Sequence, residues 1–191
     1  GIEAQRMLTS RPIEDRLSPP RPDHRKGGVL ALLYPLKQEF HMVFMKRTED
    51  DKVHSGQISF PGGKVEEYDA NPTKTALREA EEELGIPQPE VQILGTLSPL
   101  YIPPSNFLVY PSVGYMPRQP DFLPSEIEVA QVIEVPLNLL LDKKTLQQTT
   151  ITVRKDFSIQ APAFMAKGNV IWGATAMMLN AVSYTHLTLP T

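Results

Sequence analysis

Apolar and polar positions alternate in short blocks along the chain, and these blocks predict several strands and a few helices. Apolar runs at residues 28–34 and 41–47 lie on either side of a connection at 35–39 and predict two neighbouring strands. Further strands are expected at 91–97, 108–116, 129–135, 148–154 and 158–161, with helices at 136–141 and 172–180. This order of strands and helices is typical of an α/β fold.

The clearest helical pattern lies between residues 72 and 84. Its apolar stripe consists of Leu77, Ala80 and Leu84, the spacing of a helix that packs on a core. Asn71 suits the N-cap, Pro72 suits the first helical position, and Gly85 provides a C-terminal stop. The sequence therefore predicts an amphipathic helix with defined ends.

A second face of this helix is acidic. Glu79, Glu82 and Glu83 fall within roughly 100° of one another around the helix axis, whereas Glu81 points elsewhere. Like charges spaced i,i+4 repel by about 0.2–0.5 kcal/mol per pair. Magnesium reverses this repulsion, because it takes oxygen ligands and is commonly shared between carboxylates and substrate phosphates. The alternative interpretation is a solvated acidic surface.

The end of this segment resembles a known motif. Residues 78–86, REAEEELGI, match the end of the Nudix box, R-E-U-x-E-E-x-G-U, in which U is apolar. The start departs from the general box, because Asp69 replaces a glutamate and one extra residue precedes Arg78. This departure resembles the coenzyme A pyrophosphatase branch, where G-G-x-x-D-x-x-D precedes A-L-R-E-A. Glu66 stands at the first of those two aspartates.

An upstream motif strengthens the resemblance to that branch. Arg47, Lys52, Gly56 and the FPGG sequence at 60–63 follow the spacing R…R-x-x-x-G-x-x-x-F-P-G-G. Lys52 replaces an arginine, which keeps the charge but loses two-point phosphate recognition. We therefore identify the chain, on resemblance, as a Nudix protein similar to coenzyme A pyrophosphatases.

The resemblance implies a domain organisation. It predicts one Nudix domain at residues 27–182, an α/β/α sandwich with a mixed β-sheet. Residues 1–26 are expected to form an N-terminal arm, since 11–25 is rich in proline and charge. The last nine residues, SYTHLTLPT at 183–191, look like a translated sequencing adapter, so we expect a non-native tail; a native polar tail is the alternative.

The resemblance also implies metal-dependent hydrolysis of a diphosphate. Mg²⁺ or Mn²⁺ would neutralise the phosphate oxygens and activate a water molecule. The expected ligands are Glu79, Glu82, Glu83 and the backbone carbonyl of Gly63. Arg78 is expected to hold Glu82 through an i,i+4 pair, the alternative being a plain surface salt bridge.

The general base is left open between two places. Glu79 in the box could take the proton from water. Glu126 or Glu128, on a downstream loop, is the competing candidate, and Glu128 better fits the glutamate–valine pair that precedes the next strand in many Nudix enzymes.

The substrate expectation follows from charge. Coenzyme A (CoA) carries a 3′-phosphate beside its diphosphate, and Arg47, Lys52 and His54 are the candidate phosphate-binding residues, although His54 could equally be structural. The leading hypothesis is cleavage of CoA, or a derivative, to 3′,5′-ADP and 4′-phosphopantetheine. One alternative substrate class is ADP-ribose or NADH-type dinucleotides. Another alternative is a nucleotide-binding module without turnover, against which the intact glutamates argue.

Composition narrows the class without proving it. Of 191 residues, 41% are hydrophobic and 21% are charged, which fits one soluble domain. A formal net charge of -3 gives no basic footprint and argues against nucleic acid as a partner. Zero cysteines exclude a disulfide scaffold or thiolate metal site. No apolar run approaches the roughly 20 residues of a membrane span. We expect a cytoplasmic enzyme without a membrane partner; its oligomeric state stays open.

Overall fold

The computed structural model describes residues 19–48, 56–154 and 157–187 of the chain, with only the backbone at 153–154 and 183–187. A mixed sheet of eight strands forms the centre of this described part. Its strands are β1 (Arg25–Leu36), β2 (Glu39–Arg47), β3 (Ile58–Ser59), β4 (Gly62–Lys64), β5 (Gln92–Thr96), β6 (Leu100–Ile102), β7 (Phe107–Tyr115) and β8 (Val129–Pro136). Strands β1 and β7 run parallel, and the other neighbouring pairs run antiparallel. The predicted α/β fold with a mixed sheet is confirmed.

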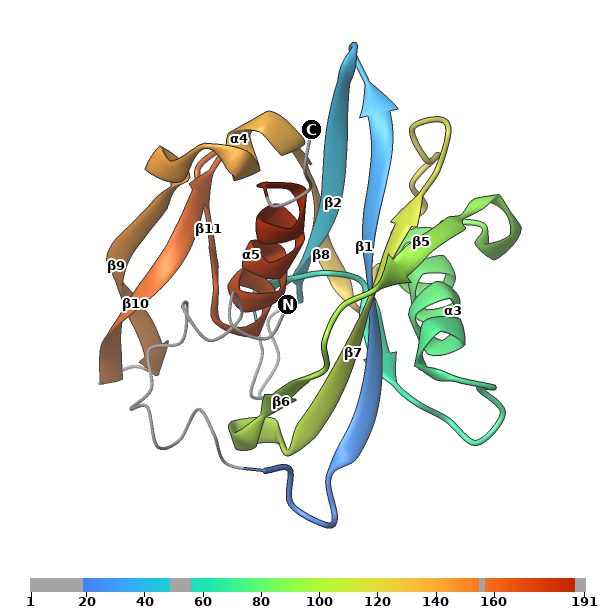
Figure 1. The fold of residues 1–191 in the computed structure, drawn as a ribbon, viewed down its shortest axis with the longest axis horizontal. Coiled ribbons are helices and arrows are strands. Elements are labelled where there is room, and N and C mark those ends of the chain that lie inside the picture. Colours follow the sequence, from blue (N-terminus) through green and yellow to red (C-terminus); the bar gives the residue numbers. More distant parts are fainter. Residues whose placement is uncertain (1–18, 49–55, 155–156, 188–191) are drawn as a thin grey trace.

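Strands β1 and β2 form a long hairpin (Figure 1). Leu36 pairs with Glu39, so the connection contains only Lys37 and Gln38. Both turn residues have positive φ angles, 50° and 64°, as the right-handed twist of a two-residue hairpin favours. The two predicted strands are confirmed, and they extend further into the expected connection because this turn is so short.

The FPGG segment (residues 60–63) lies where β1 and β2 no longer pair with each other. Ser59 of β3 pairs with Met45 of β2, and Gly63 of β4 pairs with Gly28 of β1. The chain from β3 to β4 therefore bridges two strands that pair directly only near their hairpin end. This insertion places the glycines of the motif in the middle of the sheet.

Helix α3 (Pro72–Leu84) covers one face of the sheet (Figure 1). Asn71 caps its start by accepting from the Lys74 N–H at 3.0 Å, and Gly85 ends it in the left-handed conformation with φ of 70°. A Cβ at Gly28 would overlap the Pro72 carbonyl, so the helix start lies directly on the backbone of β1. The predicted helix, its caps and its buried apolar stripe are confirmed.

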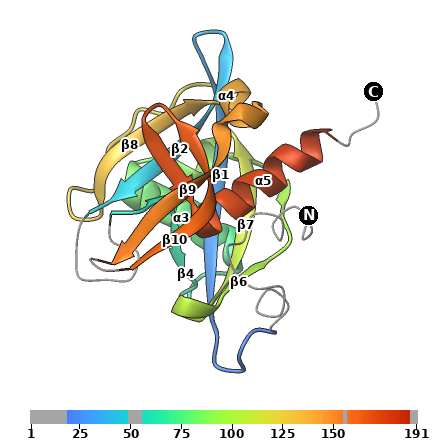
Figure 2. The same ribbon diagram turned by 90° about the vertical axis from the view of Figure 1, so that its left-hand side faces the viewer.

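The opposite face is covered by helix α5 (Gly173–Leu187) and by a small antiparallel sheet (Figure 2). This sheet contains β9 (Leu146–Arg154), β10 (Phe157–Ala166) and β11 (Asn169–Trp172), and α4 (Leu137–Leu141) lies at its end. Three short 3₁₀ turns occur at Gln88–Glu90, Pro103–Ser105 and Lys143–Thr145. None of the described helices is long and apolar enough to cross a membrane.

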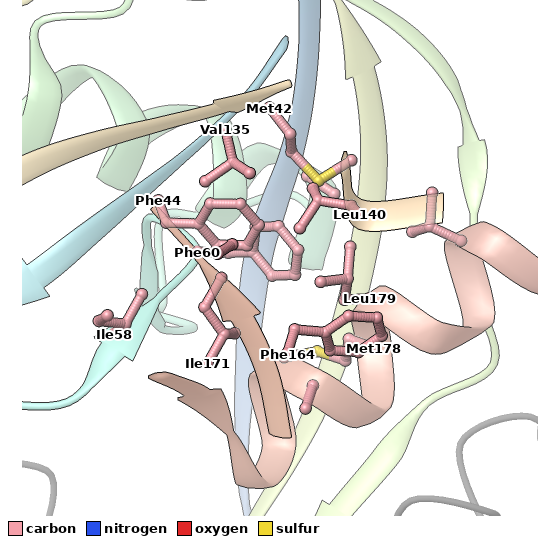
Figure 3. Close-up of a cluster of buried hydrophobic side chains, with 14 of the residues drawn as sticks. Met42, Phe44, Ile58, Phe60, Val135, Leu140, Phe164, Ile171, Met178 and Leu179 are labelled. Atoms are coloured by element: carbon pink, nitrogen blue, oxygen red, sulfur yellow. The ribbon is translucent and has the colours of Figure 1, made fainter. Parts of the chain in front are cut away.

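Two apolar clusters fill the space on either side of the sheet. Along β1, Leu30, Leu32 and Tyr34 belong to the cluster beneath α3, whereas Ala31 and Leu33 belong to the cluster on the α5 side. This alternation is the two-residue period of a strand buried on both faces. Figure 3 shows the second cluster, in which the stacked rings of Phe44 and Phe60 have centroids 4.9 Å apart.

The later predicted strands and helices are present with shifted bounds. The strand expected at 158–161 continues to Ala166, and the final helix extends from Gly173 to Leu187. Strands β3, β4, β6 and β11 were not predicted, because each has only two to four residues. Helix α5 enters the segment expected to be a tail, but its side chains there are not described, and the assignments of arm and tail stay predictions.

Candidate active site and metal centre

Glu83 is buried where α3 meets the FPGG turn. Its side chain is 2% exposed, and its Oε2 accepts the Gly62 N–H at 2.8 Å while Oε1 lies 3.3 Å from Nη1 of Arg47. Burial raises the pKa of Glu83 to about 8, although the Gly62 N–H and Arg47 act in the opposite direction. The local structure thus holds a carboxylate with an unusually high proton affinity against a glycine backbone.

Glu79 lies one turn earlier, directly over Gly63. A Cβ at Gly63 would overlap the Glu79 carboxyl group, so the second glycine of the motif provides the space for it. Burial raises the pKa of Glu79, and Arg78 opposes this shift from 2.8 Å. Glu79 and Glu83 therefore approach the same glycine turn from the same helix.

Arg78 organises the acidic groups. Its Nε and Nη2 donate to the two oxygens of Asp69 at 3.1 and 3.0 Å, and its Nη1 reaches Glu79 and Glu82 at 2.8 and 2.9 Å. The predicted i,i+4 contact with Glu82 is present. With 15% of its side chain exposed and three carboxylates bound, Arg78 is not a plain surface salt bridge.

Asp69 is the anchor of this network. Besides Arg78 it accepts the Thr75 hydroxyl at 2.9 Å and the Glu66 N–H at 3.0 Å. Its contact with Arg78 is the largest cause that lowers the pKa of Asp69 to about 2. The box departs from the general pattern at this residue, yet the shorter side chain still forms a two-point contact. Sequence reasoning recognised Asp69 as part of the box but did not give it this role.

The loop before β8 docks on the end of α3. Ser125 N donates to the Glu83 carbonyl and Leu123 N to the Leu84 carbonyl, both at 2.9 Å, which satisfies helix carbonyls that lack partners within the helix. The same loop carries Glu128, whose negative charge raises the pKa of both Glu79 and Glu83. Glu128 is thus a candidate base whose charge acts on Glu79 and Glu83.

The Gly63 backbone carbonyl was expected to bind the metal ion, but the pairing of β4 with β1 directs it elsewhere. Hydrogen-bonded pairs alternate along an antiparallel ladder. The bonds on either side of the Gly28–Gly63 pair are Leu30 N to Pro61 O and Val65 N to Lys26 O, both 2.9 Å. Gly63 therefore occupies a hydrogen-bonded position, and its carbonyl faces β1 instead of the glutamates. Its contribution to the site is the space that it leaves for Glu79.

The predicted substrate-binding residues divide into two groups. Arg47 lies in the site, with its guanidinium beside Glu83. Lys52 and His54 lie outside the described residues, so their roles stay predictions.

The donor set has the chemistry that a hard divalent cation requires, but it is not assembled as a closed cage. In the described part of the chain, no three acidic or histidine side chains are grouped as a metal site. Glu82, 56% exposed, is turned toward Arg78. Two observations nevertheless fit a cation: carboxylates face a glycine cradle, and the buried Oγ of Ser59 has no hydrogen-bond partner. Ser59 pairs with Met45 and so faces the α3 side.

The family assignment follows from comparison with known proteins. The family model of the NUDIX domain matches residues 24–152. The "Uncharacterized Nudix hydrolase NudL" of Photorhabdus laumondii is 31% identical over 169 residues, which cover 86% of this chain and 89% of that protein. The chain belongs to the Nudix family.

Solved structures support the same fold. A Nudix hydrolase from M. smegmatis, RenU, aligns with a TM-score of 0.60 at 13% identity and covers 88% of this chain and 89% of its own. The NUDIX domain of Shewanella oneidensis NrtR, crystallised with ADP-ribose, aligns with a TM-score of 0.50 at 18% identity over 69% of this chain and 87% of its own. At these identities the likeness concerns the fold.

Proposed function

We propose that this chain is a metal-dependent Nudix hydrolase that cleaves the diphosphate bond of CoA or a CoA derivative. The products would be 3′,5′-ADP and the corresponding 4′-phosphopantetheine compound. The observation that carries the proposal is the approach of Glu79 and Glu83 to the Gly62–Gly63 turn, with Glu82 held beside them by Arg78.

Each residue has a separate part in this reaction. Glu79, Glu82 and Glu83 would hold Mg²⁺ or Mn²⁺, which neutralises the diphosphate and lowers the pKa of the attacking water. Arg78, fixed by Asp69, orients Glu79 and Glu82. Glu128, whose charge is felt by Glu79 and Glu83 from the loop before β8, would accept the proton of the water. Glu79 is the alternative base.

Support for CoA as the substrate comes from the sequence. The FPGG turn and the spacing of Arg47, Lys52 and Gly56 resemble the CoA pyrophosphatase branch. Lys52 and His54 are the proposed partners of the extra phosphate. The competing substrate class is ADP-ribose or a dinucleotide such as NADH, which the ADP-ribose complex of NrtR favours. A cytoplasmic location without nucleic-acid or membrane partners belongs to the same proposal.

A product-resolved assay separates these substrates. Hydrolysis of CoA, 3′-dephospho-CoA, ADP-ribose and NADH would be compared with Mg²⁺ and with Mn²⁺, and each product identified by mass. We expect CoA to react fastest. Equal rates for CoA and 3′-dephospho-CoA would remove the role of the 3′-phosphate, and faster ADP-ribose cleavage would favour the alternative. A metal-loaded chain that binds CoA but releases no phosphopantetheine would be a binding module instead of an enzyme.

A further inference from the structure

Arg47 and Arg78 contact the acidic cluster in different ways. Arg78 binds Asp69 through two nitrogens at 3.0 and 3.1 Å. Arg47 approaches Glu83 with one nitrogen, at 3.3 Å, which is long for a charge-assisted hydrogen bond. The side chain of Arg47 is 33% exposed, more than twice the exposed fraction of Arg78. Arg47 is thus the looser of the two and the one that solvent and ligands can reach.

Each carboxylate oxygen of Glu83 already has one partner, with which a cation would have to share it. Its Oε2 is fixed by the Gly62 N–H at 2.8 Å, and its Oε1 faces Arg47. A main-chain N–H within the sheet cannot swing away, whereas a guanidinium on a long side chain can. Oε1 is therefore the oxygen that can be shared with a metal ion.

We infer that Arg47 serves two partners in turn: it neutralises Glu83 through Oε1, and it transfers its guanidinium to the substrate diphosphate when Glu83 turns Oε1 to the metal. This inference rests on the proposed function and deepens it, because it assigns one residue opposite effects on metal binding and on substrate binding. No covalent bond changes in this exchange.

The backbone around Arg47 is held by hydrogen bonds on both sides, so a change of partner would involve the side chain alone. Its N–H donates to the Gln57 carbonyl at 3.0 Å, and the next N–H, of Thr48, donates to the Glu128 carbonyl at 3.1 Å. The Cα position is thereby tied both to the residue that precedes β3 and to the loop that carries Glu128. The backbone is held on both sides, whereas the guanidinium is held only by the long contact with Glu83 and is one-third exposed.

Electrostatics explains why the exchange would be coupled to metal binding. A buried carboxylate that loses its counter-charge is strongly destabilised. The guanidinium of Arg47 therefore leaves Glu83 only when another positive charge replaces it. A diphosphate, which carries negative charge on neighbouring oxygens, is then the partner that a planar guanidinium binds best.

The test uses the full chain, with variants Arg47→Ala and Arg47→Lys and the control Lys64→Ala. Lys64 is half-exposed and pairs with Glu66 at 3.4 Å, so its removal subtracts a nearby positive charge without removing a contact of Glu79, Glu82 or Glu83. Calorimetry would give the Mn²⁺ dissociation constant, and melting curves the Mn²⁺-induced rise in melting temperature. Steady-state assays would give KM for CoA. Measurements at pH 8.5 limit proton competition at Glu83.

Arg47→Ala is expected to shift two measurements in opposite directions. Mn²⁺ should bind about five- to tenfold more tightly, because a competing charge near the metal is gone. The KM for CoA should rise about ten- to a hundredfold through loss of a charge-assisted contact. Arg47→Lys should keep the Mn²⁺ affinity within about twofold and still raise KM several-fold, because an ammonium cannot bind two oxygens in a plane. Lys64→Ala should change neither strongly.

Other outcomes overturn the inference. If Arg47→Ala weakens Mn²⁺ binding, or leaves it unchanged, Arg47 does not compete with the metal for Glu83. If Arg47→Lys leaves KM unchanged, Arg47 does not bind the diphosphate, and this variant decides the matter should Arg47→Ala fail to fold. A wild-type chain that neither binds Mn²⁺ nor cleaves any diphosphate would instead contradict the proposed function itself.

Discussion

The two faces of the central sheet are built from alternate residues of the same strands but differ in chemistry. On the α5 side, Phe44 and Phe60 stack in a closed apolar cluster (Figure 3). On the α3 side, Ser59 of β3 faces the same side of the sheet as α3, and Gly63 of β4 lies directly under the Glu79 carboxyl group. One short motif therefore anchors the core with its phenylalanine and opens the candidate site with its glycines. Residues that stabilise the core and residues that border the candidate site therefore lie within five positions of each other, on opposite faces of the sheet.

Truncation on the apolar face tests the first half of this comparison. Phe44→Ala should lower the free energy of unfolding by about 3–5 kcal/mol, because it leaves a cavity against Phe60 and helix α5. Chemical denaturation measures the change. At low temperature, the fraction of the variant that remains folded should keep the wild-type turnover number. A loss of less than about 1 kcal/mol would show that this cluster is not the main core.

Neutralising the buried carboxylate tests the second half. Glu83→Gln should reduce turnover by about a hundred- to a thousandfold, as expected when a preorganised charged group is removed. Stability above pH 8 should be unchanged or higher, since the folded state favours the protonated form of Glu83. Glu81→Gln is the matched control, because this exposed residue lies on the same helix and its carboxylate accepts the Gln88 amide at 2.7 Å. Near-normal Mg²⁺-dependent turnover in Glu83→Gln would contradict the ligand assignment.

Asp69 links site geometry to acid stability. Its pKa is lowered to about 2 in the folded protein, so its stabilising contact is present above its ordinary pKa and is lost as pH falls toward 2. Asp69→Asn should lower stability at pH 7 by about 1–3 kcal/mol and reduce the pH dependence between about pH 4 and 2. Unfolding curves at a series of pH values measure both effects. If the loss of stability between about pH 4 and 2 is the same in Asp69→Asn as in the wild type, Arg78 does not hold this carboxylate in solution.

The smallest effect is expected at the start of α3. Asn71→Ala removes the side-chain bond to the Lys74 N–H and should cost about 1 kcal/mol of stability. Asn71→Ser is the control, since serine caps helices comparably well. Turnover should change little in either variant, because the glutamates lie in the second half of the helix. A large loss of turnover with unchanged stability would place the helix start in the active site.

Features set by neighbouring residues were predicted well from the sequence. The caps of α3, its apolar stripe and the contact between Arg78 and Glu82 depend on residues within a few positions of each other. The pairing of Arg47 with Glu83 was not predicted, because it joins residues that only the sheet brings together. The direction of the Gly63 carbonyl likewise depends on the register between β4 and β1, which no local pattern encodes. Strand β11 was missed because four residues carry too weak a period.

The docking of residues 123–125 on the last carbonyls of α3 has a practical consequence for protein engineering. Because the loop is hydrogen-bonded to the end of α3, a chimera that exchanges the loop from residue 123 onward should displace both Glu128 and the glutamates of α3. A graft confined to the stretch between Tyr115 and Leu123 would keep that junction intact. Changes upstream of the junction should therefore leave the carboxylates of α3 in place.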